Sequence, residues 1–387
     1  MESIQSDLTT RTDLSLLYRV LRTVIKPLRP NLVKPGKPQP AGSPKLKAPK
    51  SKHGCSIHEA QHSGTKVWTY TFIPEGESLY NSFAEQADTT STKHQVLYFA
   101  GGGFQSPPSG EHWGFVSWLA RELRKTHQFV VVSYPLAPNS PACESLPVCR
   151  RFLRSFVQGL GTSGKVTLMG DSAGGNVALS LGMWWVEQIK LAEKNGEAFT
   201  WRYGVHPGKA EDEMPSGDRL ANGIYDHSVL DQIVAISPAV DMRNINPEIA
   251  RVNQHDPVLT EGLTSSVAEA WCSAPGSSGS NPTPSSNPKS VDPADPSVSP
   301  LLVSENTLKA FKAQNVQVSG VYGTYDVLGP DADLLRQKLV ESGVEGKWLK
   351  WEGQMHCFPL ASVYGLKEGK HGRGFVLDIL RNKRVDH

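Results

Sequence analysis

A serine stands among small residues in the stretch "VTLMGDSAGGNVALSLG", residues 166–182. Residues 166–169 are typical of the end of a buried strand, and the apolar residues after Gly175 recur at helical spacing. Ser172 therefore lies at a predicted strand-to-helix turn, in the pattern G-x-S-x-G. The small neighbours leave its hydroxyl at the apex of the turn, above the N-terminus of the helix, which suits a nucleophile. A glycine-rich turn into a helix that has no catalytic role can show the same pattern. Other residues must therefore show whether Ser172 is a nucleophile.

A serine hydroxyl is a weak nucleophile near neutral pH, so it needs a base, and the base needs an orienting acid. Asp326, in "VYGTYDVLGPDADLL", and His356, in "WEGQMHCFPL", each follow a predicted strand. His371 and His387 also lie beyond Asp326, but neither follows a strand. We interpret Ser172, His356 and Asp326 as nucleophile, base and acid. The alternatives for the acid are Asp331, Asp333 and Glu352.

Acyl transfer also requires N–H donors directed at the oxygen that becomes negative, and losing one donor costs about 3–4 kcal/mol. The peptide N–H of Ala173, next to the nucleophile, is one predicted donor. The glycine triplet in "YFAGGGFQS", residues 98–106, follows another predicted strand. We expect Gly101 and Gly102 to supply the other donors. A glycine triplet alone is more often a flexible turn. Here its position directly after a predicted strand supports the role as oxyanion donors.

Strand and helix signals alternate from residue 66 onward. Predicted strands cover 66–73, 95–100, 129–136, 165–170, 232–237, 316–323 and 347–351. Predicted helices cover 113–126, 145–159, 174–194, 304–314, 330–342 and about 373–383. This alternation is typical of an α/β fold whose mostly parallel sheet is covered by helices on both faces. Two long segments interrupt it, at 199–230 and 243–299.

The N-terminal region has a different character. Residues 13–29 carry apolar residues at helical spacing beside basic ones, which predicts an amphipathic, basic helix. Such a helix is compatible with peripheral membrane contact, but we favour packing over the body of the protein as part of a lid. Residues 34–52, with six lysines and five prolines, predict an irregular tether. We divide the chain into this region, 1–64, and a catalytic domain, 65–387, with a cap insertion at about 243–299.

Composition excludes several classes of protein. The 387 residues include 40 basic and 38 acidic side chains, so nothing in the overall charge indicates nucleic acid. The five cysteines contain no C-x-x-C pair, which favours reduced thiols and a cytoplasmic location. The N-terminus lacks the pattern of a secretory signal. No stretch approaches the ~18 apolar residues that cross a bilayer. The predicted chemistry requires no metal and no cofactor.

Together these strings resemble the hormone-sensitive-lipase-like family of α/β hydrolases. The matching strings are "VSYPLAPNSP" (132–141), "GDSAGGN" (170–176), "ISPAVDM" (236–242), "DPSVSPLL" (295–302), the Asp326 segment and "MHCF" (355–358). The match spans about residues 65–383. One departure is Ala100, where the family has the histidine of H-G-G-G. In the family that histidine helps to hold the loop while glycine amides make the contact. Catalysis should survive the change, whereas the rigidity of the loop is in question.

The resemblance implies a serine hydrolase that cleaves carboxylic esters through an acyl-enzyme, under a cap built from the N-terminal helix and the 243–299 insertion. We expect a small-molecule ester with a short or medium acyl group, acetyl esters of natural products included. Candidate substrate-contacting residues are Phe104, Trp113 and Tyr134, and each can equally be ordinary packing. Two alternatives stay open: an amidase or acyltransferase with the same triad, and a non-catalytic small-molecule receptor of the same fold.

Overall fold

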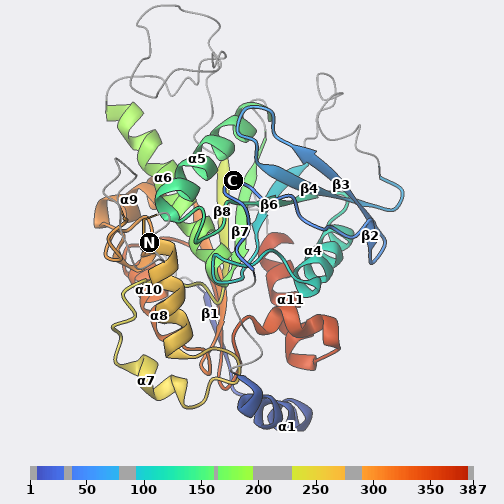
Figure 1. Ribbon diagram of the computed structural model, residues 1–387, viewed down its shortest axis with the longest axis vertical. Helices are drawn as coiled ribbons and strands as arrows, with labels where there is room; N and C mark the ends of the chain where they lie inside the picture. Colours follow the sequence, from blue (N-terminus) through green and yellow to red (C-terminus); the bar gives the residue numbers. More distant parts are fainter. Residues whose placement is uncertain are drawn as a thin grey trace, which may run out of the picture.

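A computed structural model describes residues 7–29, 37–77, 93–160, 164–194, 229–274 and 290–381. A ten-stranded sheet lies at its centre, in the order β1-β10-β9-β8-β7-β5-β6-β4-β3-β2 (Figure 1). The strands are β1 (Asp7–Arg11), β2 (Ser51–Lys52), β3 (Cys55–Gln61), β4 (Trp68–Pro74), β5 (His94–Phe99), β6 (His127–Ser133), β7 (Val166–Asp171), β8 (Leu230–Ile236), β9 (Gln317–Gly323) and β10 (Lys347–Trp351). The run from β1 to β6 in the sheet is parallel, and β4, β3 and β2 extend it with antiparallel pairs.

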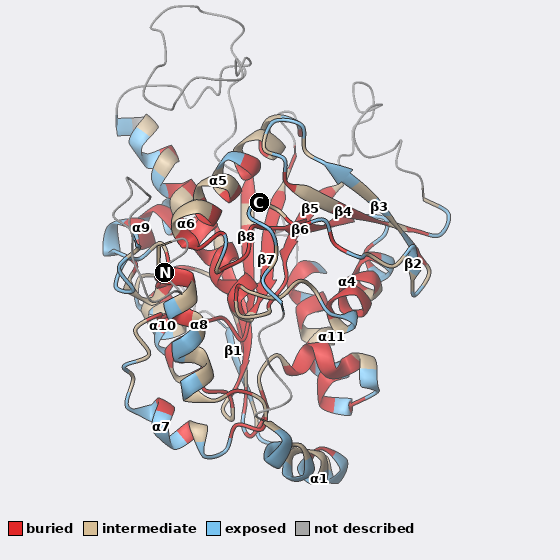
Figure 2. Ribbon diagram, viewed as in Figure 1, coloured by how far each residue is buried: buried red, intermediate tan, exposed pale blue. Residues whose placement is uncertain are grey.

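Helices cover both faces of this sheet (Figure 1). On one face lie α4 (Gly110–Glu122) and α11 (Lys367–Arg381). On the other lie α5 (Ala142–Gln158), α6 (Ser172–Lys194), α9 (Glu305–Ala313) and α10 (Gly329–Glu341). The central strands β5 and β7 are buried along their whole length (Figure 2), because parallel strands have an apolar layer on each side. The predicted α/β fold is confirmed, and the carboxyl ends of the strands carry the site.

The seven predicted strands correspond to β4–β10, and the six predicted helices correspond to α4, α5, α6, α9, α10 and α11. The edge strands β1, β2 and β3 were not predicted. Residues 55–61, which the sequence places in the N-terminal region, form β3 and pair with β4. Their polar composition gives little strand signal, because this edge strand is largely exposed. The predicted boundary at residue 64 therefore runs through the sheet.

The predicted amphipathic helix is present as α1 (Leu16–Ile25), continued by the short 3-10 helix η1 (Lys26–Leu28). One side of α1 packs on the body of the protein through the fully buried Tyr18, and Leu14, Leu21 and Ile25 contact the same apolar cluster. The other side leaves Leu16, Leu17, Val20, Val24 and Leu28 more than half exposed. The packing that we favoured therefore covers only part of the apolar surface. No helix in the described ranges has the length and apolarity to cross a membrane.

The insertion after β8 contributes α7 (Glu248–Asn253) and α8 (Glu261–Cys272). Trp271 of α8 is fully buried and stacks on Phe104, with ring centroids 4.2 Å apart. A Cβ added at Gly103 would lie 2.9 Å from Val267 Cγ2, so α8 also touches the glycine loop directly. Two 3-10 helices, η2 (Pro300–Leu302) and η3 (Phe358–Tyr364), follow later in the chain. The insertion thus lies over the loop that the sequence assigned to the oxyanion.

Candidate active site

The turn between β7 and α6 holds Ser172 in a left-handed backbone conformation, with φ of 52°. Only glycine fits on either side of it. A Cβ at Gly174 would lie 1.9 Å from the carbonyl oxygen of Phe99, and one at Gly170 would lie 2.3 Å from the carbonyl oxygen of Gly174. A strained serine held between two obligatory glycines is the geometry that G-x-S-x-G requires.

The predicted base and acid lie together. Asp326 follows β9, His356 follows β10, and His356 Nδ1 is 2.9 Å from Asp326 Oδ2. Asp326 is fully buried, and the side chain of His356 is 9% exposed. The carboxylate accepts from Nδ1–H, which leaves the lone pair of the imidazole on Nε2. Burial lowers the pKa of His356, but the negative charge of Asp326 outweighs it and holds that pKa well above its ordinary value.

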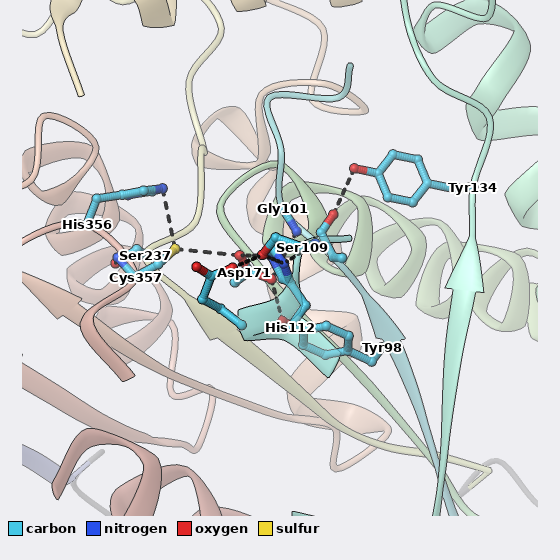
Figure 3. Close-up of polar contacts among 11 residues, drawn as sticks. Tyr98, Gly101, Ser109, His112, Tyr134, Asp171, Ser237, His356 and Cys357 are labelled. Carbon is cyan, nitrogen blue, oxygen red and sulfur yellow. Dashed lines mark hydrogen bonds and ion pairs between the residues drawn. The ribbon is translucent and has the colours of Figure 1, made fainter. Parts of the chain in front are cut away.

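The predicted contact between His356 and Ser172 is not made in this structure. His356 Nε2 lies 3.3 Å from Cys357 Sγ (Figure 3), and no hydrogen bond joins it to Ser172 in the described part of the chain. Cys357 has φ of 49° and its N–H donates to Ser237 Oγ at 3.0 Å. Burial raises the pKa of the thiol to about 12, so it is uncharged at neutral pH. The acid and base are paired, and the base faces a neutral thiol. Sequence reasoning gave Cys357 no role.

The glycine loop lies against Ser172, because a Cβ at Gly101 would be 3.0 Å from Ser172 Cβ. Of the predicted donors, Gly101 is engaged elsewhere: its N–H donates to Asp171 Oδ1 at 3.0 Å. The amides of Gly102 and Ala173 donate to no acceptor among the described residues. The same holds for Gly103, which sequence reasoning did not select. These three amides, two from the glycine loop and one from the turn at Ser172, are the available donors.

Asp171, the residue before Ser172, is the centre of a buried polar cluster (Figure 3). Its donors are Tyr98 Oη, the N–H of Gly101 and His112 Nε2 at 3.2 Å, and Cys357 Sγ lies 3.6 Å from the same carboxylate. Burial raises the pKa of Asp171, but His112 and the hydrogen bonds bring it below its ordinary value. In the sequence Asp171 is only the variable position of G-x-S-x-G, so its role was not predicted.

The three candidate substrate-contacting side chains are buried. Phe104 stacks on Trp271, and Tyr134 Oη donates to the carbonyl oxygen of Ala100 at 3.0 Å, so both lie beside the glycine loop. Trp113 packs edge-on against Tyr70 with ring centroids 5.6 Å apart. Contact of any of them with a substrate stays a prediction. What the structure shows for Tyr134 is a hydrogen bond that tethers Ala100, the residue before the glycines.

A second carboxylate, Asp256, is buried beside Asp326. It accepts hydrogen bonds from the N–H groups of Val258, Leu259 and Val327. Burial, reinforced by the negative charge of Asp326, raises the pKa of Asp256 to about 7. Nothing in the local sequence marks this residue, because its bond to Val327 joins two loops whose residues are 71 positions apart in the chain. It fixes the backbone next to Asp326.

Comparison with known families settles the class of the chain. The sequence model of the family described as "alpha/beta hydrolase fold" matches residues 96–360. The chain belongs to this family. The resemblance to hormone-sensitive-lipase-like hydrolases is thereby confirmed. An esterase of Acinetobacter venetianus is 24% identical over 277 residues, which are 71% of this chain and 70% of the relative.

Solved structures of several esterases are similar in fold. An esterase/lipase from an uncultured bacterium has a TM-score of 0.60 and 18% identity, with 95% of this chain and 98% of that chain covered. The hyperthermophilic esterase of the archaeon Pyrobaculum calidifontis has a TM-score of 0.56 and 18% identity, with 93% and 92% covered. At this identity the likeness concerns the α/β-hydrolase fold alone.

Proposed function

We propose that this α/β hydrolase is a carboxylesterase in which Ser172, His356 and Asp326 form the catalytic triad. The observation that carries the proposal is the buried Asp326–His356 pair, 2.9 Å apart. The next residue, Cys357, contacts Asp171, which directly precedes a serine held in a left-handed turn. Such a pair gives a general base whose free nitrogen can take a proton from a nearby hydroxyl. The esterase relative from Acinetobacter supports the reaction class.

In the proposed reaction, His356 Nε2 first leaves its contact with the Cys357 thiol and forms a hydrogen bond with the Ser172 hydroxyl. Nε2 then takes the hydroxyl proton as Ser172 Oγ attacks the ester carbonyl. The amides of Gly102 and Ala173 hold the negative oxygen of the tetrahedral intermediate. The amide of Gly103, in the same loop as Gly102, is a third donor. The protonated His356 gives its proton to the leaving alcohol. Water, activated by the same nitrogen, releases the acid and restores Ser172.

The stacked pair of Phe104 and Trp271 favours esters of short or medium acyl chains, because two fully buried rings close the space beside the glycine loop. A small-molecule ester is the corresponding substrate class. Cytoplasmic location, the division into two regions and peripheral membrane contact through residues 13–29 stay predictions.

The test is hydrolysis of p-nitrophenyl esters of increasing chain length, with the Ser172→Ala protein as the blank. We expect turnover of the acetate and butyrate esters, and a loss of at least about 10³-fold in Ser172→Ala. Addition of a competing alcohol separates hydrolysis from acyl transfer, because a transferase forms the new ester. Equal turnover by the wild type and Ser172→Ala contradicts the proposal.

A further inference from the structure

A buried histidine outside the triad stands at the start of α4. The N–H of Ser109, the residue before the helix, donates to His112 Nδ1 at 2.9 Å. A backbone N–H can only donate, so Nδ1 accepts and the proton of the neutral imidazole is on Nε2. His112 thus satisfies a free N–H at the helix start, as glutamate or glutamine does in a capping box.

The other nitrogen of this histidine points at the nucleophile turn (Figure 3). His112 Nε2 lies 3.2 Å from Asp171 Oδ2, and the second oxygen of the same carboxylate accepts from the N–H of Gly101 at 3.0 Å. The carboxylate therefore connects the first turn of α4 to the first glycine of the loop. The side chain of Asp171 is 3% exposed and that of His112 is 11% exposed, so water competes little for these hydrogen bonds.

The glycine loop has little freedom at this point. A Cβ at Gly101 would lie 2.4 Å from Asp171 Oδ2 and 3.0 Å from Ser172 Cβ. A shift of the Asp171 carboxylate would therefore move Gly101, and with it the free amides of Gly102 and Gly103. Misplacement of a catalytic group by about 1 Å costs about 100-fold in rate. The position of this carboxylate matters for the donors that are to meet the oxyanion.

We propose that His112 is a positioning residue for ester hydrolysis: through Asp171 it holds the glycine loop in the place where its N–H groups meet the oxyanion. This rests on the proposed function, since it concerns the reaction at Ser172. Among the described residues, His112 forms hydrogen bonds with Ser109 and Asp171 and none with Ser172, His356 or Asp326. Its effect is transmitted by the hydrogen bonds from His112 to Asp171 and from Gly101 to Asp171.

The two nitrogens of His112 separate a structural role from this positioning role. In His112→Asn the amide oxygen takes the place of Nδ1 and keeps the bond from Ser109, but the side chain is too short to reach Asp171. In His112→Gln the longer side chain brings an amide N–H to the place of Nε2. If the only role of His112 is to accept the Ser109 N–H at the start of α4, the asparagine variant behaves as the wild type. If it positions the loop, the glutamine variant is the better enzyme.

The experiment measures kcat and KM for p-nitrophenyl acetate in the wild type and both variants. We expect kcat of His112→Asn to fall about 10- to 100-fold while KM changes little, because the missing contact acts on the transition state. His112→Gln should recover most of the loss. His94→Asn is the matched control. His94 is also a buried histidine, and its Nε2 is 2.8 Å from Thr167 Oγ1, but it lies on β5 at the end of the strand opposite the glycine loop.

Thermal unfolding of each variant checks that it is folded at the assay temperature. Should His112→Asn not fold, His112→Met, which fills the space and lacks both bonds, is expected to show the same loss of kcat. A second readout is the affinity for a trifluoromethyl ketone, whose adduct with Ser172 carries an oxyanion; we expect it to weaken in parallel with kcat.

Wild-type kcat in His112→Asn, with Ser172→Ala inactive, would overturn the positioning role and leave the proposed function standing. An equal fall of kcat in His112→Asn and His94→Asn would also overturn it, because the loss would then be general. Equal turnover by the wild type and Ser172→Ala would instead refute the proposed function, and the role of His112 would fall with it.

Discussion

His356 Nε2 lies 3.3 Å from the Sγ atom of Cys357, its neighbour in the chain. The left-handed conformation of Cys357 turns the thiol back toward the imidazole, and the bond from its N–H to Ser237 holds this turn in place. The nitrogen that the mechanism assigns to the Ser172 proton is therefore in contact with a thiol in the free protein. In the proposed mechanism this contact has to break before His356 can take the proton of Ser172.

Removal of the thiol should increase the rate. A net hydrogen bond contributes about 1 kcal/mol, so we expect Cys357→Ala to raise kcat/KM by up to about fivefold. Cys357→Ser, whose hydroxyl is a stronger partner for Nε2, should lower it. Cys149→Ala is the control, because that cysteine is fully buried on α5. Identical kcat/KM in the alanine and serine variants would mean that the thiol does not compete for the base.

The pH profile should reflect the environment of His356. Only the neutral imidazole accepts a proton, and Asp326 holds the pKa of His356 well above its ordinary value, so activity should fall as the pH drops through a value above about 6.5. Asp326→Asn removes the negative charge. We expect its acid limb to move to lower pH while kcat falls by about 10⁴-fold.

Asp331→Asn is the control for that profile, since Asp331 lies in the same segment but accepts from Asn246 Nδ2 at 2.7 Å. Its acid limb should match that of the wild type. A wild-type limb centred below pH 6, or one that Asp326→Asn leaves in place, would show that His356 and Asp326 do not titrate as a catalytic pair.

Asp256 should give stability a distinct pH dependence. Its pKa of about 7 in the folded protein exceeds the value of about 3.9 in an unfolded chain, so the folded state binds more protons between these values. Stability therefore falls as the pH rises from about 4 to 7. Asp256→Asn does not titrate, and we expect this decline to be smaller in the variant.

The measurement is the free energy of unfolding by urea at several pH values. The quantity compared between the two proteins is the change of this free energy with pH, not its absolute value. The absolute value of Asp256→Asn also falls, because the carboxylate accepts three backbone N–H groups. Parallel slopes in the two proteins would show that Asp256 is charged throughout this range.

Trp271 should limit the length of the acyl chain. It is fully buried against Phe104 at 4.2 Å, beside the glycine loop. In Trp271→Leu the smaller side chain leaves space there, so we expect the ratio of kcat/KM for the decanoate ester to that for the acetate ester to rise. The substitution should also destabilise the protein by a few kcal/mol. A ratio that stays at the wild-type value would place the acyl site elsewhere.

The sequence allowed the seven inner strands and the pairing of Asp326 with His356 to be predicted, because buried strands have strong apolar patterns and triad residues follow strands in a fixed order. It did not show the edge strands β1 and β3, whose exposed side chains carry little pattern. It could not show that His356 faces Cys357, which depends on a backbone turn. Nor could it show that His112 reaches Asp171, because that contact joins residues 59 positions apart in the chain.

The central claim is that Ser172 is the nucleophile, and it is tested most directly by mass spectrometry after reaction with a fluorophosphonate. We predict one covalent adduct per chain, mapped to the peptide that contains Ser172, with esterase activity lost in proportion. Ser172→Ala should form no adduct, and His356→Ala should react far more slowly. An adduct on another residue, or an active enzyme without an adduct, would contradict the account.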